Sequence, residues 1–203
     1  EVQVRTLLQH AWAEIEHDKN YKFTGVLPDE IKRKFYLVAG VLELMDNEFD
    51  DLSRDIDEYT RNTKKAVEEG DYDLSINSKS LEQYMLKRYE NDKRVMRCHD
   101  GKVVTDGVVQ EVLQFGYKTI RDIENGLNKH LEIIARRESR TFVGILRDLM
   151  ILEDCEKYFT KVYTGGWQTT NSNTVMFWKE NGVPDIEEYL QKYNIKIKEE
   201  IHG

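Results

Sequence analysis

The sequence predicts a mainly α-helical chain, and three observations support this. Apolar residues recur at alternating spacings of four and three between residues 31 and 59, as in a long helix with one apolar seam. Shorter apolar runs with helical spacing follow between residues 80 and 190. Residues that favour helix starts, such as Thr6, Pro28 and Ser80, precede several of these runs. Strand-like alternation is confined to the first five residues.

Residues 1–5 predict a short strand with two different faces. Val2 and Val4 alternate with Glu1, Gln3 and Arg5, so the valines are expected to be buried and the three polar side chains to share the other face. A polar strand face that leads directly into a helix start is a place where a phosphate-binding site can form.

The next segment predicts an amphipathic helix that begins after Thr6. Thr6 is a favourable N-cap, and Gln9 completes a capping-box pattern. One apolar stripe follows at helical spacing, formed by Leu8, Ala11, Trp12 and Ile15. The opposite face carries His10, Glu14 and His17. This spacing differs from that of known helical metal motifs, and a hydrogen-bonded helix face is the preferred interpretation over a metal site.

A long helix is predicted from Pro28, with Asp29 and Glu30 favouring its N-terminal end. At ~1.5 Å per residue its seam is roughly 45 Å long. The seam either packs within its own chain or forms a subunit interface, and we favour the first because most apolar stripes are buried in their own domain. The acidic residues on its other faces indicate a solvated surface, since a calcium loop would need a glycine at a fixed position. The seam consists of Ile31, Phe35, Val38, Leu42, Met45, Phe49, Leu52, Ile56 and Tyr59.

A domain boundary is predicted in the polar segment 61–77, which gives a first domain over 1–60, a linker over 61–77 and a helical domain over 78–203. In the last domain we expect a helix from Ser80 towards Val95, a turn at 98–101 and three helical runs between 108 and 152. The same domain is expected to end with a tight turn at 164–167, a helix that ends near Gly182 and a short helix from Pro184. Residues 192–203 are charged and predicted to fray.

Composition excludes several classes of protein. The net charge of −8 argues against broad binding to nucleic acid or to an anionic membrane, although a local nucleotide site remains compatible with it. No apolar run approaches the ~20 residues that cross a bilayer. Cys98 and Cys155 lie far apart in the sequence and are expected to be reduced thiols of a cytoplasmic protein.

The first residues also resemble a known family. The segments E-V-Q-V-R-T, A-W-A-E-I-E-H and N-Y-K lie within about the first tenth of the chain. They are similar to the closing motif of RelA/SpoT-type alarmone synthetases, above all the small, single-function members. The resemblance implies that residues 1–60 are the end of an α+β nucleotidyltransferase-like synthetase domain. It also implies transfer of a pyrophosphoryl group from ATP to the ribose 3′-hydroxyl of GTP or GDP, with Mg²⁺, to make (p)ppGpp.

The same resemblance assigns roles to six residues. Glu1 matches the glutamate that binds Mg²⁺ and assists deprotonation of the attacking hydroxyl. Gln3 and Arg5 share its strand face, and Arg5 either contacts phosphate or forms a structural ion pair. Ala13 matches a position whose backbone contacts the guanine. Substrate-binding roles for Glu16 and His17 follow from the small family members.

The family's earlier motifs would precede Glu1. We therefore expect this chain to be the C-terminal part of a synthetase, to need the N-terminal part of the same protein, and to make no (p)ppGpp as residues 1–203 alone. Two alternatives remain. One is a related pyrophosphotransferase that acts on an RNA 3′ end, and the other is a non-catalytic helical module for homo-oligomerisation or regulation.

Overall fold

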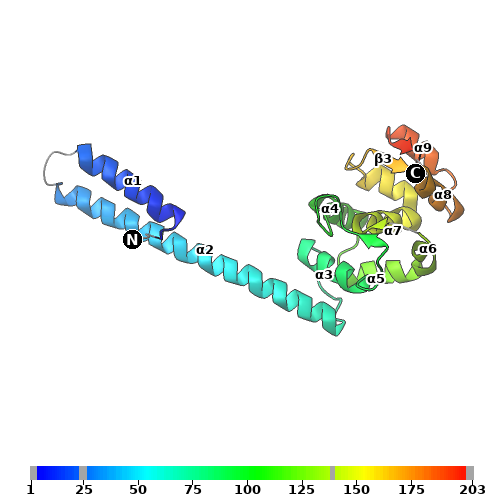
Figure 1. Ribbon diagram of the computed structural model, residues 1–203, viewed down its shortest axis with the longest axis horizontal. Coiled ribbons are helices and arrows are strands. Elements are labelled where there is room, and N and C mark those ends of the chain that lie inside the picture. Colours follow the sequence, from blue (N-terminus) through cyan, green and yellow to red (C-terminus); the bar gives the residue numbers. More distant parts are fainter. Residues whose placement is uncertain (1–3, 23–26, 138–139, 200–203) are drawn as a thin grey trace. The chain divides into compact units, whose positions relative to one another are not determined.

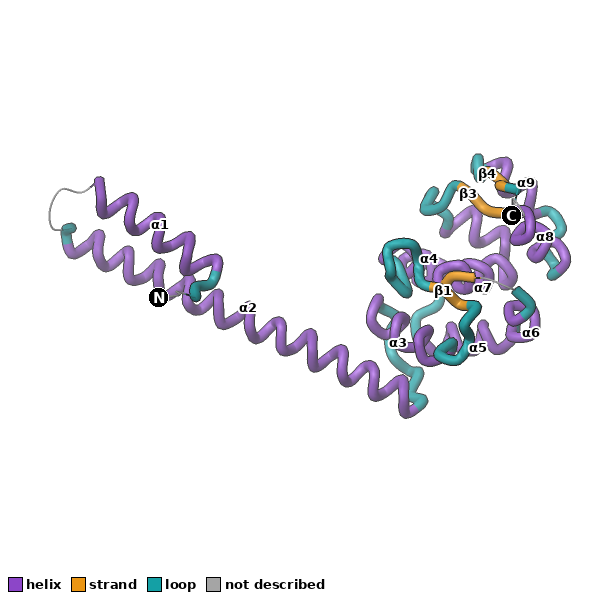
Figure 2. The backbone as a smooth tube through the Cα atoms, in the orientation of Figure 1, coloured by secondary structure: helices purple, strands orange, loops and turns teal. Residues whose placement is uncertain are grey.

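The computed structural model describes residues 4–22, 27–137 and 140–199. It is mainly helical, which confirms the predicted fold class, and its few strands are two or three residues long (Figure 2). The chain divides into two compact units, Glu1–Thr60 and Arg61–Gly203 (Figure 1).

Unit 1 is a helical hairpin. Helix α1 (Leu7–Lys22) lies alongside the first half of helix α2 (Asp29–Glu69), as Figures 1 and 2 show. The indole of Trp12 packs on the ring of Phe35 with centroids 5.4 Å apart. At the N-terminal end of α1, the Thr6 hydroxyl donates a hydrogen bond to Asp46 Oδ2 over 2.6 Å. These two contacts fix α1 against α2 from Phe35 to Asp46.

The apolar seam of α2 is only partly covered in unit 1. Ile31, Phe35 and Leu42 are half-buried. Beyond them, the seam residues from Met45 to Tyr59 are 46–59% exposed. The expectation that the seam is buried within the chain is therefore wrong for its second half in the described structure. The physical reason is the length of α1, whose N-terminal end reaches α2 only at Asp46.

Helix α2 is longer than the sequence analysis predicted. It continues through residues 61–69, which were assigned to a linker, so its 41 residues span roughly 60 Å. Two ion pairs at i, i+4 support this last part, Lys64–Glu68 and Lys65–Glu69, each at 3.8 Å. Val67 is buried within unit 2, and its carbonyl oxygen accepts a hydrogen bond from Lys87 Nζ. Polar composition alone therefore misjudged a segment whose residues are good helix formers.

Unit 2 packs short helices around one central helix, α7 (Phe142–Lys157). The inner face of α7 is fully buried and includes Ile145, Leu146 and Leu149. Two parallel strand pairs, β1–β2 and β3–β4, hold its connecting segments together. The other elements are α3 (Ser78–Arg88), β1 (Val95–Met96), α4 (Asp106–Phe115), α5 (Ile120–Lys129), α6 (Leu131–Ala135), β2 (Arg140–Thr141), the π-helix η1 (Tyr158–Val162), β3 (Thr169–Asn171), α8 (Ser172–Glu180), α9 (Ile186–Lys192) and β4 (Lys196–Lys198).

Two local predictions in unit 2 need correction. Helix α3 begins with Asn77 as its N-cap rather than Ser80. The Asn77 side chain accepts from the Lys79 and Ser80 amides, and the Ser80 hydroxyl closes the box three residues into the helix. The end of the chain is not frayed throughout, because Lys196–Lys198 pair with Thr169–Asn171 as strand β4. The predicted turn at 98–101 is confirmed by a hydrogen bond from the Gly101 amide to the Cys98 carbonyl.

The uneven burial of the seam leads to a first prediction. Leu42→Asp places a charge in the groove between α1 and α2 and should lower the stability of unit 1 by roughly 2 kcal/mol or more. Leu52→Asp, on the exposed part of the same seam, should change it by less than about 0.5 kcal/mol. Hydrogen exchange of α1 peptides measures this locally, since a chain of two units need not unfold in one step. Equal losses in the two variants would show that the outer seam is buried in solution.

Candidate functional site

The N-terminal end of α1 is fixed by the capping box that the sequence predicts. The Gln9 amide donates to Thr6 Oγ1 over 3.1 Å, and the Thr6 amide donates to Gln9 Oε1 over 3.2 Å. The same Thr6 hydroxyl donates a hydrogen bond to the carboxylate of Asp46. One side chain therefore caps α1 and anchors it to α2, which sets the position of every residue that follows on α1.

The predicted site residues fall into two groups. Glu1 and Gln3 lie outside the described residues. Arg5 precedes the cap and is exposed, while Ala13, Glu16 and His17 lie on α1. Glu16 and His17 follow Ala13 by three and four residues, so these three share one helix face. Arg5 lies outside the helix, eight residues before Ala13 in the sequence.

The predicted strand is not present in its described part. Val4 and Arg5 belong to neither a helix nor a strand, and Val4 is 92% exposed rather than buried. Unit 1 contains no strand among its described residues with which residues 4 and 5 could pair. A strand without a neighbour leaves its backbone groups unpaired and is not stable by itself.

A cavity of about 400 Å³ lies between α1 and the start of α2. Glu16 lines it together with Trp12, Tyr36 and Lys32, whose ammonium group lies 3.6 Å from Asp29 Oδ1. A carboxylate accepts N–H groups and an aromatic wall contacts flat rings, so the cavity is suited to a planar group that carries hydrogen-bond donors. Of the predicted site residues, Glu16 is the one placed in this cavity.

An apolar groove of about 410 Å³ lies along the other side of α1. All four residues of the predicted α1 stripe line it, opposite Phe35, Val38 and Leu42 of α2. The stripe therefore faces α2 as the sequence predicts, but it is not fully buried: Ile15 is 51% exposed.

Throughout the described residues there is no group of three or more His, Cys, Asp or Glu side chains that could hold a metal ion. None of the described helices is both long and apolar enough to cross a membrane.

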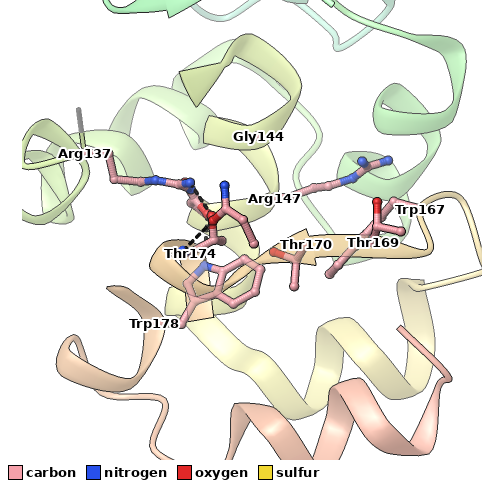
Figure 3. Close-up of a pocket in the computed structure, with 10 residues that line it drawn as sticks. Arg137, Gly144, Arg147, Trp167, Thr169, Thr170, Thr174 and Trp178 are labelled. Carbon is pink, nitrogen blue, oxygen red and sulfur yellow. Dashed lines mark hydrogen bonds and ion pairs between the residues drawn. The ribbon is translucent and has the colours of Figure 1, made fainter. Parts of the chain in front are cut away.

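Unit 2 contains a further cavity, of about 240 Å³, which the sequence analysis did not predict (Figure 3). The guanidinium of Arg137 points into its centre, and that of Arg147 lies near Trp167 at the other end. Strand β3 and the first turn of α8 form one wall, and the first turn of α7 contributes Gly144. The cavity lining includes Arg137, Arg147, Trp167, Thr170, Thr174 and Trp178.

Both arginines of this cavity are paired with buried carboxylates. Arg147 donates to Glu111 through Nε and Nη2 over 2.8 and 2.7 Å. Arg137 donates to Asp148 Oδ2 over 2.5 Å and to the Thr174 hydroxyl over 2.6 Å. Burial lowers the pKa of Arg147, but the hydrogen bonds and charge of Glu111 outweigh it, so the net pKa shift is upward and the guanidinium stays charged.

The two carboxylates are buried more deeply than the arginines. The side chains of Asp148 and Glu111 are 2% and 6% exposed. Burial raises the pKa of Asp148, while Arg137 and the Trp178 indole oppose this shift. Trp178 Nε1 donates to Asp148 Oδ1 over 2.9 Å, and the Tyr158 hydroxyl donates to Glu111 Oε2 over 3.1 Å. Each carboxylate thus accepts bonds from two side chains.

One feature of the sequence could have indicated this cavity. Residues 169–174 read T-T-N-S-N-T, a run of polar side chains between two tryptophans and just before a helix. From the sequence we predicted only the tight turn at 164–167 in this region. Arg137 and Arg147 come from other parts of the chain, so the folded structure was needed to bring them to the polar run.

The double role of Thr6 gives a second prediction. Thr6→Val keeps the shape of the side chain but removes the N-cap acceptor and the donor to Asp46, which should destabilise the start of α1 by about 1 kcal/mol or more. Faster amide exchange in the first turns of α1 is the expected observation. Thr60→Val is the matched control, because the Thr60 hydroxyl bonds only to a carbonyl within α2. Unchanged exchange in Thr6→Val would contradict the anchoring role.

Comparison with known proteins gives one partial match. No family model matches the chain, and no solved structure matches it. The chain is 33% identical over 58 residues to GTP pyrophosphokinase YjbM of Bacillus subtilis (strain 168). The match covers 29% of this chain and 28% of the length of that relative. Part of the chain is therefore related, at a distance, to an alarmone synthetase of the pyrophosphokinase kind.

Proposed function

We propose that this chain is part of a GTP pyrophosphokinase, which transfers a pyrophosphoryl group from ATP to the ribose 3′-hydroxyl of GTP or GDP and makes (p)ppGpp. The observation that carries the proposal is the 33% identity over 58 residues to a curated GTP pyrophosphokinase. The motif resemblance in the first two dozen residues points to the same reaction. In this reaction the 3′-oxygen attacks the β-phosphorus of ATP, the bond between the α- and β-phosphates breaks, and AMP leaves.

Glu1 is the proposed catalytic carboxylate and the proposed ligand of Mg²⁺. A carboxylate suits this hard cation, which is usually held by one or two protein carboxylates together with phosphate oxygens of the substrate. The absence of a three-residue ligand group among the described residues is compatible with that mode of binding. When bound, the ion neutralises charge on the phosphates. Glu1 accepts the proton of the attacking hydroxyl, and Gln3 and Arg5 contact the substrate phosphates.

The α1 face is proposed to bind the guanine nucleotide. Glu16 accepts hydrogen bonds from the N–H groups of the base, within the cavity that Trp12 and Tyr36 line. Ala13 permits close approach because its side chain is a single methyl group, and His17, on the same face, contacts the nucleotide at the rim. The cavity volume of about 400 Å³ lies within the range of roughly 300–1,000 Å³ found for small-molecule sites.

The proposed role of Glu1 gives a third prediction, tested in the protein that carries a complete synthetase domain. Glu1→Gln keeps the size of the side chain but removes the charge that holds Mg²⁺ and accepts the proton. Turnover of (p)ppGpp should fall by a factor on the order of 10² or more. The affinity for GTP, measured by calorimetry, should change much less because other residues make most contacts.

The matched control is Glu43→Gln, which changes an exposed glutamate on α2. It should leave turnover unchanged. If Glu1→Gln retains turnover within a few-fold of wild type, Glu1 is not the catalytic carboxylate. If the complete wild-type protein, supplied with ATP, GTP and Mg²⁺, makes no (p)ppGpp, the proposed function itself is wrong.

A second candidate function rests on the exposed seam of α2. The residues from Met45 to Tyr59 keep the alternating spacing of four and three while remaining about half exposed. That spacing is the geometry by which two copies of one helix pack together in a coiled coil. In this hypothesis the chain is a homo-oligomerisation or regulatory module, and the seam pairs with the seam of a second copy.

Light scattering tests the second function and is the fourth prediction. Under this hypothesis the wild-type chain has at least twice the mass of a monomer, and Phe49→Asp reduces it to one chain while its circular dichroism is retained. Lys64→Asp, on the same helix but outside the seam, should leave the mass unchanged. A monomeric wild type at all concentrations tested would exclude the module hypothesis and leave the synthetase hypothesis intact.

A further inference from the structure

The cavity of unit 2 offers guanidinium N–H groups to a ligand, and the two carboxylates next to it are already engaged by side chains of the chain itself. Asp148 accepts from Arg137 and Trp178, and Glu111, behind the cavity wall, accepts from Arg147 and Tyr158. A guanidinium has five N–H groups, and the pair with Glu111 uses only the Nε and Nη2 edge of Arg147. The Nη1 group takes no part in that pair.

The two guanidinium groups are held in position before any ligand binds. The bidentate pair with Glu111 fixes the plane of Arg147, which also lies over the Trp167 ring at 5.9 Å. Arg137 is fixed by Asp148 and Thr174 and lies 5.2 Å from the centre of the Phe177 ring. Donors with a fixed geometry bind planar or tetrahedral oxyanions with little loss of side-chain entropy.

The backbone around the cavity favours the same sign of ligand charge. Asn171 is the N-cap of α8, and Gly144 lies in the first turn of α7, so the positive ends of two helices border the cavity. This adds to the donors of the arginines and of the Thr170 hydroxyl. Since each arginine is paired with a carboxylate, the empty cavity is close to neutral, and attraction comes from local hydrogen bonds rather than from net charge.

The cavity also has an apolar side and a limited size. The rings of Trp167 and Trp178 lie 6.2 Å apart and line the cavity next to the arginines, Trp178 as a largely buried side chain. Its volume of about 240 Å³ corresponds to about eight water molecules at roughly 30 Å³ each. That is less than the roughly 300 Å³ at the lower limit for drug-sized ligands. The ligand is therefore small, or inserts only its anionic end.

We propose that this cavity binds a small organic anion, a phosphate ester or a carboxylate, whose oxygen atoms are bound by Arg137 and Arg147 and whose adjacent carbon atoms contact Trp167 and Trp178. The site lies entirely within unit 2 and does not depend on the proposed synthetase function. Pre-organised guanidinium groups beside indole rings are the observation that carries it (Figure 3).

The experiment uses the three tryptophans of the chain as reporters. The full chain is labelled with ¹⁵N and titrated with phenyl phosphate, benzoate or phenol, which share a flat ring and differ in charge. The indole signals of Trp167 and Trp178 should shift with at least one of the two anions. Trp12 lies in unit 1, so its signal reports separately on the cavity there, and phenol should shift neither Trp167 nor Trp178. The anion that binds more tightly identifies the ligand as a phosphate ester or a carboxylate.

Variants then test the arginines. Arg137→Lys and Arg147→Lys keep the positive charge but lose the planar fork, so each should weaken binding about tenfold or more. Arg121→Lys is the matched control, because Arg121, on α5 of the same unit, forms an exposed ion pair with Asp73. Because binding depends on hydrogen bonds in a nearly neutral cavity, moderate salt should change the affinity only slightly.

Three results would overturn the proposal. One is the absence of any shift of Trp167 and Trp178 with both anions, and another is an equal effect of phenol. The third is a loss of affinity in Arg121→Lys as large as in Arg147→Lys. Should the lysine variants fail to fold, the comparison of the three probes on the wild-type chain still decides between these outcomes.

Discussion

Unit 2 depends on two buried ion pairs made by consecutive residues of its central helix, Arg147 and Asp148. Arg147 joins α7 to Glu111 on α4, and Asp148 joins it to Arg137, just before β2. Removing one partner of such a pair leaves an uncompensated buried charge and costs roughly 3–5 kcal/mol. Because the two residues carry opposite charges and point to different neighbours, a slip of α7 by one residue would bring one of them opposite a group of its own charge. The pairs therefore fix the rotation of α7 as well as its contacts.

The same pairs order the segment that follows α7. Glu111 accepts a bond from the Tyr158 hydroxyl, which in turn accepts one from Trp167 Nε1 over 2.9 Å. Tyr158 lies at the start of the π-helix η1, a rare turn that is frequent at functional sites. Burial raises the pKa of Tyr158, so its hydroxyl remains a donor to Glu111 at neutral pH. This chain of bonds places the Trp167 ring beside the cavity.

Sequence patterns predicted the parts of the fold that depend on local spacing. The Thr6–Gln9 capping box, the α1 stripe and the apolar runs of α4, α5 and α7 are set within a few turns, so they could be recognised without a structure. The exposure of Val4 and of the outer seam could not be predicted in this way, because the burial of a side chain depends on which other segment packs against it. The pairs Arg147–Glu111 and Arg137–Asp148 connect residues 36 and 11 positions apart, and no spacing rule links them.

Unit 2 buries its core around α7, whereas the helices of unit 1 leave much of their apolar surface exposed. Helix pairs owe most of their stability to burial of an apolar face, and here Phe49, Leu52 and Ile56 remain more than half exposed. An apolar groove beside α1 adds to this surface. Exposed apolar area of this kind marks a place where another surface binds. Both hypotheses for the protein supply one, either the remainder of a synthetase domain or a second copy of α2. They differ in which part must be covered: a synthetase domain that uses Glu16 has to reach the α1 face, whereas a coiled coil covers only the seam beyond Asp46 and leaves that face open.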